Sequence, residues 1–163
     1  LLTAQFYAPA LIIMIDLDDN RLAVARRFGA THTFNSSRDA VVRLVRDLTD
    51  DKGVDAAIEA VGVPATFSLC EELVAPGGVI ANVGVHGTKV DLHLEKLWSH
   101  NITITTRLVD TVSTPMLLKT VEAKRLQPEQ LITHHFALDD ILAAYETFSN
   151  AAASQALKVV IAA

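Results

Sequence analysis

The sequence lacks several features that would define its class at once. Among its 163 residues there is a single cysteine, Cys70, so no internal disulfide can form, which fits a reducing compartment. No apolar run approaches the roughly 20 residues that a membrane-spanning helix needs. Basic residues number 14 against 19 acidic ones, and the resulting charge of −5 disfavours nucleic acid and anionic lipid as partners. We therefore expect a cytoplasmic protein with no nucleic-acid or membrane partner.

Apolar runs alternate with amphipathic stretches along the chain. Half of the residues are hydrophobic, which is enough for a substantial core. The pattern predicts strands at residues 11–15, 32–35, 54–60, 79–83, 102–108, 136–138 and 157–161, and helices at 19–28, 38–49, 64–74, 94–99, 114–124 and 139–148. A Pro-Gly-Gly sequence at 76–78 predicts a turn. This alternation is typical of an α/β fold with a doubly wound parallel sheet and helices on both faces.

Three kinds of catalytic or binding motif are missing. No G-x-G-x-x-G phosphate loop occurs, and no nucleophile elbow occurs either. The histidines show no spacing that specifies zinc, and Cys70 falls in a predicted helix, where a small buried apolar role is expected. We therefore predict no catalytic residue and no metal ligand within this chain.

Ligands of open parallel sheets bind beyond the carboxyl ends of the strands, so candidate binding residues are expected there. Asp16 ends the first buried strand, where a carboxylate can accept hydrogen bonds from both hydroxyls of an adenosine ribose and repel a 2′-phosphate, which favours NAD over NADP. Alternatively, Asp16 only begins a turn in which Asp18 and Asp19 cap the next helix. Arg21 either contacts the same ribose or adenine, or is a solvated helix residue.

Two glycines follow predicted strands. Gly62 and Gly84 could each allow close approach of a cofactor to the backbone, or could each be an ordinary turn glycine. The acidic residue of a dinucleotide fold usually lies about 20 residues after its phosphate loop. Counting back from Asp16 therefore places that loop just before Leu1, and we expect the chain to begin inside a longer protein, with residues 1–7 as the end of a helix.

Four segments, taken in order along the chain, form a combined pattern: residues 12–31, 53–62, 76–85 and 102–106. Together they resemble, in the same order, the second strand and helix, the fourth strand, the fifth strand and the sixth strand of the medium-chain zinc-dependent alcohol dehydrogenases. The resemblance covers nearly the whole chain. It implies an incomplete Rossmann-type domain at residues 1–125, and a segment at 126–163 that returns to the catalytic domain in the family.

The resemblance also implies a set of cofactor contacts. Asp16 matches the ribose-binding acid and Arg21 the basic residue beside it. The other matching positions are Ala60, Val61 and Gly62 near the adenosine, Val83, Gly84 and Val85 at the nicotinamide carboxamide, Thr106, Arg107 and Leu108 at the edge of the nicotinamide pocket, and Lys158 at the pyrophosphate. Arg107 departs from the family, whose members often carry glycine there.

By this resemblance, the central first strand, the phosphate loop, the zinc ligands and the proton relay all lie upstream. We therefore expect an interruption in the sheet between the strands at 11–15 and 54–60. The family's zinc ion polarises an alcohol, and its nicotinamide accepts the hydride. Family members are dimers or tetramers, which implies a homo-oligomer.

The function expected from the sequence is thus the NAD-binding portion of an alcohol dehydrogenase acting on a primary or secondary alcohol, or on the matching carbonyl compound. The chain alone is expected to be inactive. Two alternatives remain open at this point: an S-adenosylmethionine-dependent methyltransferase, which also places an acid after its second strand, and a non-catalytic nucleotide-binding module.

Overall fold

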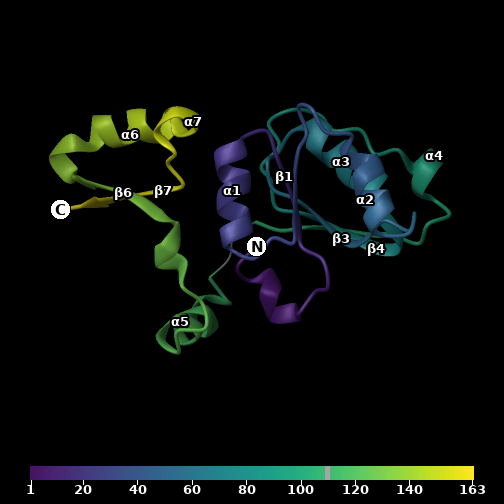
Figure 1. Cartoon of the computed structure of the whole chain (residues 1–163), viewed down its shortest axis with the longest axis horizontal. Helices are drawn as coiled ribbons and strands as arrows, with labels where there is room; N and C mark the ends of the chain where they lie inside the picture. Colours follow the sequence, from purple (N-terminus) through teal and green to yellow (C-terminus); the bar gives the residue numbers. More distant parts are fainter. Residues whose placement is uncertain (109–110) are drawn as a thin grey trace. The chain divides into compact units, whose positions relative to one another are not determined.

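A computed structural model describes residues 1–108 and 111–163. The chain divides into two compact units, one formed by residues 1–39 and 111–163 and the other by residues 40–110. All described strand pairs are parallel, as the alternation of strands and helices predicts. The architecture is a mixed α/β fold of the Rossmann type, with its labelled elements shown in Figure 1.

The first part of the first unit is a two-stranded sheet covered by a helix. Strand β1 (Ile13–Asp16) pairs with β2 (His32–Asn35), and α1 (Asp19–Arg27) packs on both strands. Helix α1 begins where it does because the Asp18 carboxylate accepts hydrogen bonds from the first-turn amides of residues 20 and 21. Before this sheet, residues 1–7 form only a short 3₁₀ turn at Ala4–Tyr7, and not the end of an α-helix.

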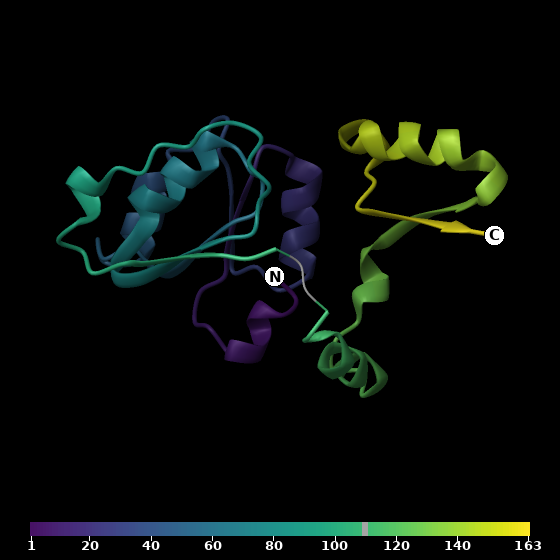
Figure 2. The same cartoon turned by 180° about the vertical axis from the view of Figure 1, so that it is seen from behind.

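The C-terminal part of this unit forms a separate small sheet. Its elements are α5 (Thr114–Glu122), the 3₁₀ turns Pro128–Leu131 and Leu138–Asp140, β6 (Ile132–Ala137), α6 (Ile141–Ser149), α7 (Ala151–Ser154) and β7 (Lys158–Ala162). Strands β6 and β7 pair with each other, and α6 packs on both, as both views show (Figures 1 and 2). Strand β6 begins before the predicted segment 136–138, and burial alternates along all six of its residues, as in a strand with one covered face.

The second unit is built on a three-stranded sheet in the order β3-β4-β5. Its elements are α2 (Val41–Leu48), β3 (Val54–Glu59), α3 (Pro64–Leu73), β4 (Val74–Asn82), α4 (Leu94–Leu97) and β5 (Thr103–Thr106). Helix α3 packs on β3 and β4, and α2 packs on α3. The core contains Ile80, which is fully buried, and Cys70, which confirms the expected apolar role of this cysteine.

The predicted turn at 76–78 is wrong. Strand β4 runs through these residues, and its pairing with β3 shifts from Val54–Val74 to Ala56–Val79, so the extra residues form a bulge within the strand. The Gly77 amide donates a hydrogen bond of 2.7 Å to the His100 carbonyl, which fixes the bulge. The proline and glycines therefore interrupt the regular pairing without ending the strand.

The strands of the two units belong to separate hydrogen-bonded ladders. Strands β1 and β2 form one ladder and β3, β4 and β5 another, and in the described residues no ladder joins β1 to β3. Within the same residues, no helix has the length and apolar character needed to cross a membrane.

Candidate functional site

The carboxyl ends of three neighbouring strands meet at one edge of the second unit. Glu59 pairs with Asn82, and Asn82 pairs with Thr106, so β3, β4 and β5 end in register. Three of the segments singled out in the sequence leave the sheet at this edge: residues 60–62, 83–85 and 106–108. The topology thus brings together nine of the twelve predicted cofactor-binding residues, at the place where open parallel sheets bind ligands.

The turns after β3 and β4 pack directly against each other through two glycines. A Cβ added to Gly62 would lie 2.3 Å from the Val85 carbonyl oxygen, and Gly62 has a positive φ of +87°. A Cβ added to Gly84 would lie 2.4 Å from the Gly62 nitrogen. Only glycine fits at either position. The neighbouring side chains of Val61, Val83 and Val85 are exposed and could form an apolar wall for a ligand.

Glu59, the last residue of β3, lies buried beneath these turns. Its Oε1 atom accepts hydrogen bonds from the amides of Val61 (2.9 Å) and Gly62 (2.8 Å) and lies 2.6 Å from Thr66 Oγ1. Burial raises the pKa of this carboxyl, but the hydrogen bonds from Thr66, Gly62 and Val61 and the nearby His86 outweigh burial, so the pKa lies below its usual range. Glu59 is therefore an ionised buried group.

His86 is the second residue that the sequence analysis missed. Its Nε2 atom lies 2.8 Å from Asn82 Oδ1 and 3.3 Å from Glu59 Oε2, and its ring packs edge-on against Phe67. The side-chain Nδ2 atom of Asn82 in turn donates to the Gly84 carbonyl at 3.1 Å. The signal in the sequence that could have pointed to this network is a glutamate at the end of a largely apolar strand.

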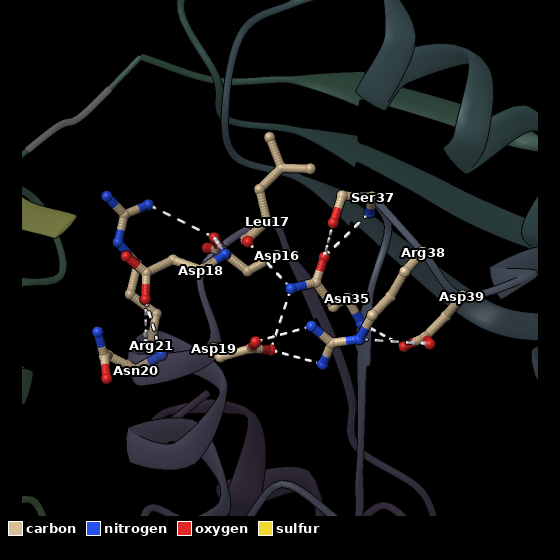
Figure 3. A network of polar contacts seen from close by, with 10 residues as sticks. All are labelled: Asp16, Leu17, Asp18, Asp19, Asn20, Arg21, Asn35, Ser37, Arg38 and Asp39. Atoms are coloured by element: carbon tan, nitrogen blue, oxygen red, sulfur yellow. Dashed lines mark hydrogen bonds and ion pairs between the residues drawn. The ribbon is translucent and has the colours of Figure 1, made fainter.

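Two further predicted residues lie close together in the first unit: Asp16 ends β1, and Arg21 lies in the first turn of α1 (Figure 3). Asp16 Oδ1 accepts a hydrogen bond of 2.9 Å from the Asp18 amide and lies 3.6 Å from Arg21 Nη1. Both contacts use the same oxygen, and within the described residues Asp16 Oδ2 has no partner. The capping interpretation is confirmed for Asp18, which caps α1, and is wrong for Asp19, which is the first residue of that helix. The turn uses one carboxylate oxygen of Asp16.

Behind Asp16, a buried asparagine holds the turns after β1 and β2 together (Figure 3). The Asn35 side chain is 3% exposed; its Nδ2 donates to the Leu17 carbonyl and to Asp19 Oδ1, each at 3.0 Å. Asn35 Oδ1 accepts from both the amide and the hydroxyl of Ser37. The residues that lead to α2 are held by these bonds, which is why that helix begins at Val41 and not at Arg38 as predicted.

The remaining predicted positions, residues 106–108 and Lys158, make fewer contacts that bear on a binding site. Thr106 ends β5, and the exposed residues Arg107 and Leu108 follow it, with the Arg107 amide donating to the Asn82 carbonyl at 3.4 Å. Lys158 begins β7, and in the described residues no contact joins it to Asp16 or Arg21. Asp16, Arg21 and Lys158 belong to the first unit and the other nine positions to the second.

Neither a metal site nor a reactive cysteine is found among the described residues. No group of three or more His, Cys, Asp or Glu side chains among them is placed to hold a metal ion. Burial raises the pKa of the Cys70 thiol to about 11, so this cysteine is not a nucleophile near neutral pH. These residues therefore do not fit a zinc ion, and we derive no chemical step from zinc.

Comparison with known proteins assigns the family. A sequence model described as zinc-binding dehydrogenase matches residues 6–123. The chain belongs to this family. The resemblance noted in the sequence is thereby confirmed, and membership decides against the methyltransferase alternative.

Individual relatives agree with this assignment. The chain is 35% identical over 151 residues to an alcohol dehydrogenase of Cupriavidus necator, covering 90% of this chain and 41% of that protein. It is 30% identical over 139 residues to an L-threonine 3-dehydrogenase of Paraburkholderia phymatum, covering 83% of this chain and 40% of that protein. Among solved structures, the apo form of zinc-dependent alcohol dehydrogenase 2 from Streptococcus pneumonia shows 52% identity and a TM-score of 0.94, covering 98% of this chain and 46% of the other. The chain thus spans less than half the length of these relatives.

Proposed function

We propose that this chain is the cofactor-binding part of an NAD-dependent alcohol dehydrogenase that transfers hydride from a primary or secondary alcohol to NAD. The observation that carries the proposal is the carboxylate of Asp16 at the end of β1, which has one oxygen engaged and one available. An acid at this place accepts hydrogen bonds from the ribose hydroxyls of NAD and disfavours the extra phosphate of NADP. The alcohol dehydrogenases among the relatives support the reaction class.

The roles proposed for the chain's own residues follow from their positions. Asp16 and Arg21 would hold the adenosine ribose, and residues 60–62 would lie near the adenosine. The nicotinamide would be contacted by Val83, Gly84 and Val85 and by Thr106, Arg107 and Leu108. Lys158 would contact the pyrophosphate. When bound, the nicotinamide supplies the hydride-accepting carbon, and these residues orient it and keep water away.

The activity itself depends on residues outside this chain. Since no group of three or more His, Cys, Asp or Glu side chains among the described residues is placed to hold a metal ion, we propose that the chain by itself binds cofactor without turning over an alcohol or carbonyl substrate. This makes a non-catalytic nucleotide-binding module the second candidate for the isolated chain. We further propose a boundary near residue 125, consistent with the family match ending at 123, a homo-oligomeric state and a cytoplasmic location.

The test compares the full-length protein that contains this chain with the 163-residue chain alone. NADH fluorescence and S-adenosylmethionine binding are titrated on both, and NADH formation is followed with primary and secondary alcohols in the presence of zinc. We expect NADH binding and alcohol-dependent turnover by the full-length protein, and no turnover by the isolated chain, whose folding is checked by circular dichroism. Absence of NADH binding to the full-length protein would overturn the proposal, and turnover by the isolated chain would overturn the assignment of catalysis to other residues.

A further inference from the structure

The buried carboxylate of Glu59 connects the two turns that form the proposed cofactor wall in the second unit. We infer that Glu59 is a positioning residue: together with His86 it holds residues 60–62 and 83–86 in one fixed arrangement, and this arrangement sets the affinity for the nicotinamide cofactor. The inference rests on the proposed function. It adds to it a residue that does not touch the cofactor and acts through the backbone that does.

The first half of the connection runs through Oε1 of Glu59. This oxygen accepts the amides of Val61 and Gly62, so the turn after β3 folds back over the end of its own strand. The same oxygen lies 2.6 Å from Thr66 Oγ1, in the first turn of α3. The helix dipole there favours a negative charge. An ionised group with three donors around one oxygen holds the turn more firmly than a neutral side chain would.

The second half runs through Oε2, which faces the turn after β4. His86 Nε2 lies between this oxygen, at 3.3 Å, and Asn82 Oδ1, at 2.8 Å. A Cβ on Gly84 would come within 2.2 Å of Oε2, so the backbone of the second turn lies directly on the carboxylate. Main-chain hydrogen bonds also join Glu59 to the second turn, because the amides of Val83 and Gly84 donate to the Glu59 carbonyl at 2.8 and 3.1 Å.

This placement argues for a role beyond simple stability. Neither oxygen of Glu59 reaches solvent, since the side chain is fully buried, so the group cannot contact a ligand itself. Every partner it has belongs to the turns or to the start of α3. Exposed Val61, Val83 and Val85 are carried by those turns, and a small independent movement of either turn would separate the surfaces that face a bound cofactor.

The same unit contains a matched control. Glu71 on α3 is also nearly buried, with 6% of its side chain exposed, and it also binds a histidine, His93, at 2.7 Å. Its partner precedes α4 and does not belong to the turns at the strand ends. Glu59→Gln and Glu71→Gln therefore each remove the charge of a carboxylate that is nearly or fully buried against a histidine, and only Glu59→Gln touches the proposed cofactor wall.

The experiment uses the full-length protein and NADH as the probe. Glu59→Gln places an amide nitrogen against His86 and loses that contact, so we expect the NADH dissociation constant and the KM for NAD to rise about tenfold, with kcat at saturating NAD within about twofold of the unsubstituted protein. Glu71→Gln should leave NADH affinity within about twofold at a similar loss of thermal stability. Hydrogen exchange at residues 60–62 and 83–86 should accelerate in Glu59→Gln and remain unchanged in Glu71→Gln.

A second variant covers the case in which Glu59→Gln does not fold. His86→Asn keeps Glu59 and its bonds to Val61 and Gly62, and should raise the NADH dissociation constant by about threefold to tenfold; where both single variants fold, their combination should be less than additive because they share one contact. Unchanged NADH affinity in a folded Glu59→Gln or His86→Asn variant would overturn the inference. Failure of the unsubstituted protein to bind NADH would overturn the proposed function instead, and the hydrogen-exchange comparison would still report whether Glu59 holds the two turns.

Discussion

Both terminal nitrogens of Arg38 donate hydrogen bonds of 2.7 Å to Asp19, one to each carboxylate oxygen. Asp19 is the first residue of α1, and Arg38 follows β2, so the pair connects the turns after the two strands of the first unit (Figure 3). Hydrogen bonds from Arg38, and then from Asn35, lower the pKa of Asp19 from 3.8 to about 2. The proposed ribose-binding residue Asp16 lies three positions before this connection.

The lowered pKa predicts how the pair responds to acid. Because the pKa is lower in the folded chain, the stabilisation is present above the unfolded value of 3.8 and is lost as the pH falls through about 2. A carboxyl-carbon NMR titration should therefore give Asp19 a midpoint near 2, and Arg38→Gln should move it toward 3.8. A midpoint that does not move in Arg38→Gln would show that Arg38 is not the cause.

Asn35 should matter more for stability than the exposed ion pair next to it. Replacement by alanine removes four side-chain hydrogen bonds at a position that is 3% exposed, and leaves the Leu17 carbonyl without its partner. We expect Asn35→Ala to lower the free energy of unfolding by about 2–3 kcal/mol, measured by urea denaturation. Asn20→Ala, at an exposed position of α1, is the control and should stay within about 0.5 kcal/mol of the unsubstituted protein. Equal losses in the two variants would contradict the network.

The parallel α/β architecture could be predicted from the sequence, and so could the position of Arg21 near the end of the strand that Asp16 closes, because both depend on local pattern. A buried strand ends at a fixed point, and a residue one turn into the next helix necessarily lies near that end. Glu59 could not be distinguished in this way. Asp55 lies on the same face of β3 and is exposed, whereas Glu59 is buried only because the turn after β4 closes over it. Such burial depends on the register between strands, which the sequence pattern does not contain.

The bond between Glu71 and His93 predicts a second pH dependence, of opposite sign. The hydrogen bond and the charge of Glu71 raise the pKa of His93 above 6.5, so the stabilisation is fully present below 6.5 and is lost as the pH rises through the raised value. The difference in thermal midpoint between the unsubstituted protein and His93→Gln should therefore shrink with rising pH above 6.5. His135→Gln, at an exposed position of β6, should show no such trend. A constant difference for His93→Gln would refute the ionic contribution.

The proposed ribose contact of Asp16 can be tested by removing its charge alone. Asp16→Asn keeps the shape of the side chain but loses the charge-assisted hydrogen bond, so we expect NADH affinity of the full-length protein to fall about tenfold. Affinity for NADPH should fall less or improve, because repulsion of the 2′-phosphate is removed. Asp47→Asn, at an exposed position of α2, is the control with unchanged affinities. Equal losses for both coenzymes in Asp16→Asn would contradict a role in their discrimination.

Two glycines with similar positive φ angles allow the cost of backbone strain to be separated from the cost of steric crowding. Gly62 has a φ of +87° and Gly77 a φ of +79°, so an alanine at either position adopts an unfavourable left-handed conformation, which costs about 1–2 kcal/mol. At Gly77 the added Cβ meets nothing within 4 Å, whereas at Gly62 it lies 2.3 Å from the Val85 carbonyl oxygen. Gly62→Ala must therefore push the two turns apart, and its total loss of unfolding free energy should exceed that of Gly77→Ala by about 1–3 kcal/mol. Urea denaturation measures this difference, and NADH titration of the full-length protein should show weaker binding in Gly62→Ala alone. Equal stability of the two variants would show that the turns after β3 and β4 yield easily, and that their close packing does not constrain the site.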